Sequence, residues 1–175
     1  MPADGGGLRE LPAPSTGTAL LKEEMGRWLS NLAPWDVFST WTFSRPVRAE
    51  GAMYWGRRHI RKLDEMAGMG KGNTYAFVAA ETGDVGGLVH LHALVGNVGH
   101  LKAYCEQPMR PGEWGHPCCM VHAWPCGYAR VFTYDPKLGA SFYVGKYITK
   151  AMAEWELVSF PTQAQKSFDP RAVKR

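Results

Sequence analysis

The spacing of hydrophobic residues along the chain predicts alternating helices and strands. Between residues 18 and 32, apolar side chains recur three or four positions apart, which is typical of an amphipathic helix, and Pro34 closes this segment. β-branched and aromatic residues dominate 35–43 and predict a strand. A second helix is expected over 52–66, before a glycine-rich break.

The second half of the chain continues this alternation. Residues 75–81 and 88–95 are expected to be two strands joined by a hairpin-type connection. Beyond them the pattern predicts a short helix near 98–105, an irregular proline-rich stretch, a strand at 129–134 and a final helix over 139–155. Hairpin-joined strands interrupted by helices favour an α+β fold, in which helices pack on an antiparallel sheet.

The length of 175 residues suits one domain with a single hydrophobic core. We expect this domain to span 18–158, after a flexible segment 1–17 and before a loose tail 159–175. The sequence has no internal repeat, and it lacks the phosphate-binding loop of P-loop ATPases.

Composition and charge narrow the class of protein only slightly. The formal net charge is +4 and the sequence pI about 8.9, which is compatible with a nucleic-acid partner. The sequence contains neither a signal-peptide pattern nor an apolar run of the roughly 18–20 residues that cross a bilayer. We therefore expect a cytoplasmic protein with no membrane partner, whose cysteines are reduced or bind metal.

Two histidines in the predicted strand 88–95 form the first candidate site. His90 and His92 stand two positions apart, so both imidazoles lie on one face while apolar residues occupy the other. A hairpin would bring Glu81, at the end of the preceding strand, beside them. Two imidazoles and a carboxylate can hold a divalent cation and leave positions open for water or a phosphate oxygen. The alternative is a pair of ordinary surface or core histidines, with Glu81 solvated.

The predicted final helix carries a second set of candidate residues. Tyr143 and Tyr147 are four positions apart and so neighbours on one helical face, and Lys146 and Lys150 flank them. A phenol can attack phosphorus once a nearby cation favours its ionised form. Otherwise both tyrosines are packing residues at the edge of the core. An opposite apolar stripe is expected to pack on the sheet, formed by Phe142, Ile148, Met152 and Trp155.

The cysteines form a further group. Cys118, Cys119 and Cys126, together with the nearby His116 and His122, could assemble a structural zinc site. Adjacent cysteines do not reproduce the usual Cys-x₂₋₄-Cys spacing, however, and other residues would have to complete the tetrahedron. Buried thiols in an irregular segment are the favoured interpretation.

Basic residues cluster on the predicted helix 52–66. Arg57, Arg58, Arg61 and Lys62 share its polar side. The simplest interpretation is a solvated face, and the alternative is a surface that contacts DNA phosphates, to which Lys150 would add.

Three motifs together resemble the replication-initiator branch of the HUH endonucleases, a superfamily named after its histidine–hydrophobic–histidine motif. In the family's order, the matching segments are Phe38-Ser39-Thr40-Trp41-Thr42-Phe43, His90-Leu91-His92 and Tyr143-Val144-Gly145-Lys146-Tyr147-Ile148-Thr149-Lys150. Paired tyrosines around a lysine typify the two-tyrosine initiators of phages and some plasmids. Trp124-Pro125-Cys126-Gly127 also resembles a Trp-x-x-Gly feature of these initiators.

The resemblance implies a fold, an activity and partners. The fold would be a five-stranded antiparallel sheet of RNA-recognition-motif or ferredoxin-like topology, flanked by helices. Mg²⁺ or Mn²⁺ would be bound by His90, His92 and Glu81, with Tyr143 and Tyr147 as nucleophiles and Lys146 assisting. Such an enzyme nicks single-stranded DNA at an origin, near a hairpin, through a covalent 5′-phosphotyrosine link, and works with a host helicase and polymerase in rolling-circle replication.

Other functions remain open on the sequence. A related HUH transposase or relaxase shares the histidine motif, although relaxases place the tyrosine before the histidines and transposases usually show Tyr-x-x-x-Gln. A non-catalytic module for single-stranded nucleic acid would present stacking aromatics on the sheet, where this sequence puts His90 and His92. A zinc-stabilised interaction domain would use the cysteines alone.

Overall fold

The computed structural model describes residues 16–83, 87–106, 115–148 and 154–160. In these segments the helices are α1 (Thr16–Leu32), α2 (Ala49–Ala67) and α3 (Gly139–Ile148). The strands are β1 (Val37–Phe43), β2 (Tyr75–Thr82), β3 (Val89–Gly96), β4 (Gly127–Thr133) and β5 (Trp155–Val158). No helix in the described segments combines the length and the apolar character needed to cross a membrane.

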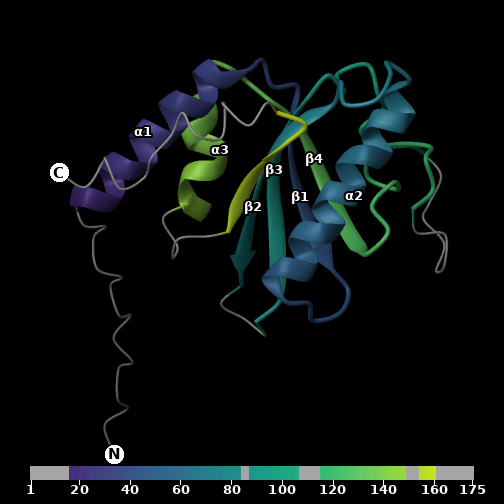
Figure 1. Cartoon of the computed structure of the whole chain (residues 1–175), viewed down its shortest axis with the longest axis horizontal. Coiled ribbons are helices and arrows are strands. Elements are labelled where there is room, and N and C mark those ends of the chain that lie inside the picture. The colour runs from purple at the N-terminus through teal and green to yellow at the C-terminus, as the bar shows by residue number, and fades with distance from the viewer. Residues whose placement is uncertain (1–15, 84–86, 107–114, 149–153, 161–175) are drawn as a thin grey trace, which may run out of the picture.

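The strands form one sheet in the order β4-β1-β3-β2-β5, and every neighbouring pair is antiparallel (Figure 1). The predicted α+β architecture, a five-stranded antiparallel sheet with helices packed on it, is therefore confirmed. The pattern of hydrophobic residues had indicated only four of these strands.

One face of the sheet is buried under α2. Side chains alternate along each strand, so Trp41 of β1, Val78 of β2 and Leu91 of β3 share this face and are fully buried. Gly56 lets the helix lie close to the strands, because a Cβ at this position would be only 3.0 Å from Cδ1 of Leu91. The close contact between α2 and the sheet therefore depends on a residue without a side chain.

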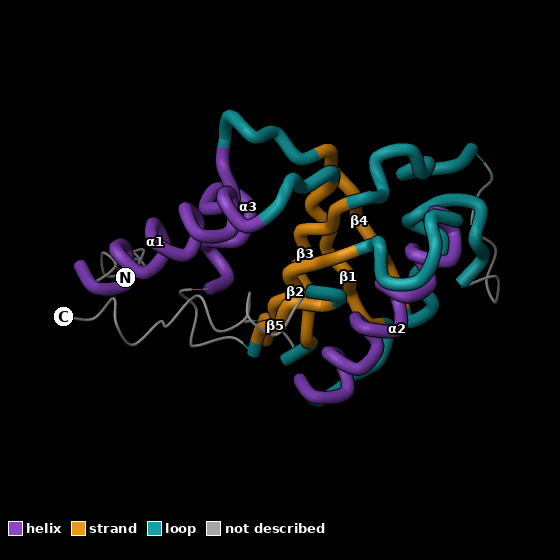
Figure 2. Tube along the Cα trace, turned by 45° about the horizontal axis from the view of Figure 1, so that its top comes forward, coloured by secondary structure: helices purple, strands orange, loops and turns teal. Residues whose placement is uncertain are grey.

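The opposite face is covered over only part of its area. Helices α1 and α3 lie side by side on the far side of the sheet from α2 (Figure 2). They bury Phe38, Phe77 and Leu94, whereas no helix of the described segments lies on the neighbouring part of the same face, towards β4. The uncovered part is called the open face below.

The short helix expected near 98–105 is wrong, because this segment forms turns. Its backbone finds partners outside itself. Asp36 accepts hydrogen bonds from the N–H groups of Val98 and Gly99, at 2.7 and 2.9 Å. The carbonyls of Lys102 and Ala103 accept from the backbone of the segment that precedes β4. These bonds replace the internal bonds of a helix.

The expected helix over 139–155 is wrong at its C-terminal end. Helix α3 is described to Ile148, and Trp155 begins β5, where it pairs with Ala79 of β2. Residues 149–153, which include Lys150 and Met152, lie outside the described residues. The expected apolar stripe is also wrong at Phe142, which is 64% exposed, whereas Ala140 and Val144 are buried.

Candidate metal site and nucleophile

The open face holds the histidine pair. His90 and His92 of β3 lie opposite Thr42 and Thr40 of β1, and all four side chains point to the same side of the sheet. The apolar residues that alternate with the histidines are buried against α2. The strand periodicity of the sequence therefore places both imidazoles as expected, with His92 buried and His90 half-buried.

Each imidazole is held by a threonine hydroxyl. Nδ1 of His92 lies 3.2 Å from Oγ1 of Thr40, and Nδ1 of His90 lies 3.1 Å from Oγ1 of Thr42. When Nδ1 carries the proton and donates to the hydroxyl, Nε2 has its lone pair available for a metal ion. The two threonines belong to the strand motif that resembled the HUH family, and this contact gives the motif a physical role.

Glu81 stands beside the pair. It is the register partner of His90 across β2 and β3, and its Oε2 lies 2.9 Å from Nε2 of His92. Both side chains are nearly buried, at 11% and 5% exposure. The hairpin expected from the sequence thus delivers the carboxylate. A cavity of about 430 Å³ opens over these residues and continues to β4.

The triad fits a divalent ion in ligand type, and its spacing is looser than that of a closed site. Among the described residues, one group of ligand side chains has all its ligand atoms within 4.8 Å of one another. That group is made of cysteines and a histidine elsewhere in the fold and does not include this triad. Coordination of one ion by His90, His92 and Glu81 therefore requires a side-chain rotation. Gly83 leaves room for one, since a Cβ there would lie 3.2 Å from Nε2 of His90.

Tyr143 lies on α3, on the same side of the sheet as the histidines. Its ring contacts Phe38 at 5.4 Å between centroids, and Phe38 stacks in turn on His92 at 6.1 Å with nearly parallel planes. The phenol oxygen accepts a hydrogen bond of 2.8 Å from the backbone N–H of Asp135. One aromatic ring, that of Phe38, therefore separates the candidate nucleophile from the histidine pair. The hydroxyl of Tyr143 is hydrogen-bonded to the turn that precedes α3.

The other residues of the tyrosine motif are only partly described. Positions 146 and 147 belong to the backbone of α3, with position 147 one helical turn beyond Tyr143. The side chains of Lys146 and Tyr147, and the whole of Lys150, lie outside the described residues.

Strand β4 adds residues that sequence analysis missed. Tyr128, Arg130 and Phe132 line the same cavity as the histidines, and both aromatic rings are about half exposed, at 52% and 49%. The Arg130 guanidinium lies 5.6 Å from the centre of the Tyr128 ring. Their alternation with buried Ala129 and Val131 was a signal available in the sequence.

The Trp-x-x-Gly feature has a structural role. Trp124 is fully buried and stacks on Trp41 at 5.6 Å, and its Nε1 donates to the carbonyl of Thr42 at 3.0 Å. Gly127 passes so close to β1 that a Cβ would lie 2.2 Å from the same carbonyl oxygen. Trp124 and Gly127 together fix the position of β1 at Thr42, the residue whose hydroxyl contacts a candidate ligand.

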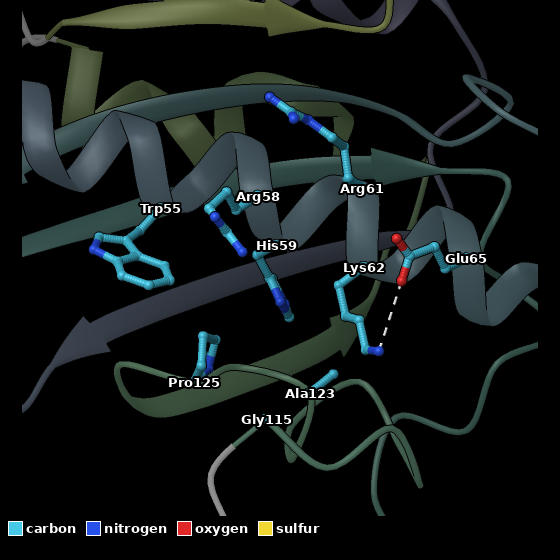
Figure 3. A pocket seen from close by; sticks show the side chains of 9 residues that line it. All are labelled: Trp55, Arg58, His59, Arg61, Lys62, Glu65, Gly115, Ala123 and Pro125. Carbon is cyan, nitrogen blue, oxygen red and sulfur yellow. Dashed lines mark ion pairs between the residues drawn. The ribbon is translucent and has the colours of Figure 1, made fainter.

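The basic residues of α2 lie on the other side of the sheet from the histidines. Arg57 forms a 2.8 Å ion pair with Glu156 of β5, and Lys62 pairs with Glu65 at 3.6 Å. Arg58 and Lys62 point towards the loop that carries Ala123 and Pro125, whereas Arg61 points away from it (Figure 3). A cavity of about 450 Å³ lies between this helix and the loop. Any DNA contact here would be separate from the open face.

The cysteines do not group as expected. Cys126, whose pKa is raised to about 11 by burial, stands apart from the others. Cys105, which was not part of the zinc site considered from the sequence, joins Cys118, Cys119 and His122. None of the four cysteines, all of which lie in the described segments, forms a disulfide.

Comparisons of the chain with family models, with curated proteins and with solved structures found no match. Its function has therefore to be inferred from its own residues and their arrangement.

Proposed function

We propose that this chain is a metal-dependent endonuclease of the HUH type, which nicks single-stranded DNA and becomes joined to it through a tyrosine. The substrate would be a replication origin, with the released 3′-hydroxyl extended by a host polymerase behind a host helicase. The support is the set of His90, His92 and Glu81 on an uncovered sheet face, with Tyr143 on the helix that borders it.

The order of strands supports the family-level part of the proposal. Within the sheet, β4-β1-β3-β2 is the order of an RNA-recognition-motif or ferredoxin-like fold, in which the first crossover is a helix, here α2. The second crossover, between β3 and β4, is an irregular loop in its described parts. We assign the fold to this topology with that one replacement.

The donor set suits a hard divalent cation such as Mg²⁺ or Mn²⁺. Two imidazole nitrogens and one carboxylate oxygen leave positions for phosphate oxygens, and the threonine hydroxyls orient the imidazoles from behind. A bound ion would polarise the phosphate and disperse the negative charge that develops on it during cleavage.

The chain's own contribution to cleavage is the nucleophile. The oxygen of Tyr143 would form a bond to phosphorus while the bond from phosphorus to the 3′ oxygen breaks. The phenol proton is lost as the 3′ oxygen gains one, so the products are a 5′-phosphotyrosine and a free 3′-hydroxyl. The hydroxyl of Tyr143 must first give up its hydrogen bond with the N–H of Asp135, which lies in the turn before α3. Tyr147 would make a second cut, and Lys146 would stabilise the phosphate.

Covalent capture tests the proposal directly. The protein is mixed with single-stranded oligonucleotides and Mn²⁺, and the products are separated under denaturing conditions. We expect a protein–DNA adduct that requires the metal, is lost in His92→Ala, is strongly reduced in Tyr143→Phe, is partly reduced in Tyr147→Phe and is absent from the double tyrosine variant. Mass mapping should place the nucleotide on the 142–150 segment. An adduct elsewhere, or cleavage that persists in EDTA, would overturn the proposal.

A second candidate is a non-catalytic module that binds single-stranded nucleic acid. The observation that favours it is the pair of half-exposed rings, Tyr128 and Phe132, beside Arg130 on the open face, since aromatic rings next to a cation are the usual platform for unstacked bases. This module would bind the same oligonucleotides equally well in EDTA and would never form an adduct.

A further inference from the structure

The connection between β3 and β4 is built without regular structure. Residues 97–106 and 115–126, the described parts of this connection, contain turns and neither helix nor strand. They nevertheless cover the sheet face beside α2, where Met120 and Trp124 are fully buried in the core. Ordering a long irregular segment costs conformational entropy, and such segments commonly depend on a cross-link or a metal ion.

Four ligand atoms converge within this connection. Sγ of Cys105 lies 3.1 Å from Sγ of Cys118, and Nδ1 of His122 lies 3.0 Å from the first sulfur and 3.1 Å from the second. Cys119 completes the group, with its sulfur 3.9 Å from that of Cys118. All four ligand atoms lie within 4.8 Å of one another.

These separations match those around one tetrahedral ion. Zinc bonds of about 2.3 Å to sulfur and about 2.0 Å to nitrogen place two ligand sulfurs about 3.8 Å apart, and a sulfur and a nitrogen about 3.5 Å apart. The sulfur–sulfur distances of 3.1 and 3.9 Å lie below and just above the first figure, and the sulfur–nitrogen distances of 3.0 and 3.1 Å are both shorter than the second. Thiol hydrogen bonds account for single contacts in this group, whereas a shared cation accounts for the convergence of all four ligand atoms.

The surrounding backbone is arranged as around a thiolate. The N–H of His122 points at Sγ of Cys119, 3.4 Å away, and so places positive charge against that sulfur. Gly115 donates to the carbonyl of His122 at 3.0 Å, and Met120 donates to that of Lys102 at 2.9 Å. The last bond ties the segment of Cys118 and Cys119 to the segment of Cys105.

We propose that Cys105, Cys118, Cys119 and His122 form a structural zinc site that staples the β3–β4 connection to the back of the sheet. Three thiolates and one imidazole give a closed four-ligand set, which leaves no position for a substrate and selects zinc over Mg²⁺ or Mn²⁺. The site faces away from the histidine pair, and the inference does not rest on the proposed nuclease.

The proposed zinc site also positions the β4 edge of the sheet. Tyr104, the neighbour of Cys105, donates its hydroxyl to the carbonyl of Val131 at 3.0 Å and accepts from the N–H of Val131 at 3.2 Å. Val131 belongs to β4, the edge strand that carries Arg130 and Phe132. Zinc binding therefore holds the strand that lines one side of the open face.

Metal analysis of the full chain tests the site. The protein is produced with zinc in the medium and purified without chelators, and its metal content is measured by mass spectrometry. We expect about one zinc per chain, retained in His92→Ala and lost in Cys118→Ser and His122→Ala. Cys126→Ser is the matched control, since this cysteine lies outside the group, and it should keep the zinc.

Thiol reactivity of the unaltered protein gives a readout that does not depend on any variant folding. Before chelation, Cys126 alone should be open to a thiol reagent, and all four cysteines should react once a strong chelator has removed the metal. Cobalt in place of zinc should give the absorption of a tetrahedral thiolate complex. A protein with no zinc and four freely reactive thiols, a Cys105–Cys118 disulfide in the purified chain, or full zinc in Cys118→Ser would each overturn the inference.

Discussion

The hydroxyls of Thr40 and Thr42 hold the two imidazoles by their Nδ1 atoms. Both act on Nδ1, on the far side of the ring from the nitrogen that approaches Glu81 in His92. Without a hydroxyl there, the imidazole would lose the contact that orients it, although every proposed ligand would still be present.

Replacing Thr40 with valine should therefore weaken Mn²⁺ binding about 10–100-fold, the range usual for loss of a hydrogen-bonding partner behind a metal ligand. Valine keeps the shape and the strand preference, so the fold should be retained. Calorimetric titration with Mn²⁺ measures the effect. Thr40→Ser, which keeps the hydroxyl, is the control, and equal weakening in the serine variant would contradict a role for the hydrogen bond.

His59 of α2 is a titratable residue buried in the described core. Burial lowers its pKa from 6.5 to about 3, although a hydrogen bond to the backbone of Ala123 acts in the opposite direction. Its ring packs edge-on against Trp41 and Trp124, and its Nδ1 has no hydrogen-bond partner among the described residues. The folded protein therefore keeps this imidazole neutral in mildly acidic solution.

This lowered pKa makes stability depend on pH in a defined direction. Above pH 6.5 the ring is neutral in both the folded and unfolded states and has no effect. Between pH 6.5 and about 3 only the unfolded chain takes up the proton, so the free energy of unfolding should fall by up to about 1.4 kcal/mol per pH unit. Urea denaturation at pH 7 and pH 5 should show this fall, and His59→Gln should lose that part of it. An identical pH dependence in the variant would exclude His59 as its source.

The histidine pair and the cysteine group show how far single residues could be predicted. His90 and His92 could be placed because a strand has a period of two, which needs no knowledge of the fold. Cys105 could not, because a turn-rich connection brings it to Cys118 and His122, and no local rule relates their spacing to that contact. Arg130 was missed for a different reason, since exposure on the open face depends on where α1 and α3 stop.

Helices α1 and α3 meet through small residues, and this contact positions Tyr143. A Cβ on Gly26 of α1 would lie only 2.2 Å from the Cβ of Ser141 on α3. The two helices can approach this closely only while position 26 lacks a side chain. The hydroxyl of Ser30 also accepts the N–H of Ala140 at 2.9 Å, which caps the start of α3.

Gly26→Ala should therefore destabilise the protein by about 1–3 kcal/mol through overpacking, and should reduce adduct formation by moving α3. The matched control is Gly51→Ala on α2, where a Cβ would meet nothing within 4 Å. There the better helix propensity of alanine should stabilise by about 0.5–1 kcal/mol. Thermal and urea unfolding of both variants measure the difference. Equal effects at the two positions would show that propensity alone, and not helix contact, is responsible.

At the level of elements, β5 shows where the hydrophobic pattern is insufficient. Trp155–Val158 is four residues long, which is too short for a strand periodicity to be recognised. It also follows a segment whose hydrophobic spacing is typical of a helix. Its strand geometry comes from pairing with Ala76–Ala79 of β2, far away in the sequence. The long strands β1, β2 and β3 were predicted because each carries its own pattern.

Under the proposed function, the whole molecule has two separate surfaces on which nucleic acid would bind. The open face offers Arg130 with two half-exposed rings, and the opposite side offers the basic residues of α2. A single strand that occupies the open face alone does not reach α2, because the sheet lies between them. Length of the bound strand should therefore determine which arginines contribute.

Binding of oligonucleotides at several salt concentrations tests this arrangement. For a short strand, within the roughly 4–16 nucleotides that one small domain covers, Arg130→Gln should reduce the salt slope by about 0.7. Neutralising Arg58, Arg61 and Lys62 together should leave that slope unchanged for the short strand and reduce it for a long one. A loss with the short strand would place the bound DNA on α2 instead of the open face.

The hydroxyl of Tyr104 occupies both backbone groups of Val131 at the outer side of β4. An unpaired edge strand offers such groups to any extended segment, and sheets grow into fibres by this route. Here a side chain from a neighbouring loop takes the place of the next strand. At Val131, a second copy of the chain would find both backbone groups already paired. Tyr104→Phe should therefore leave these two groups unpaired and favour association at this edge.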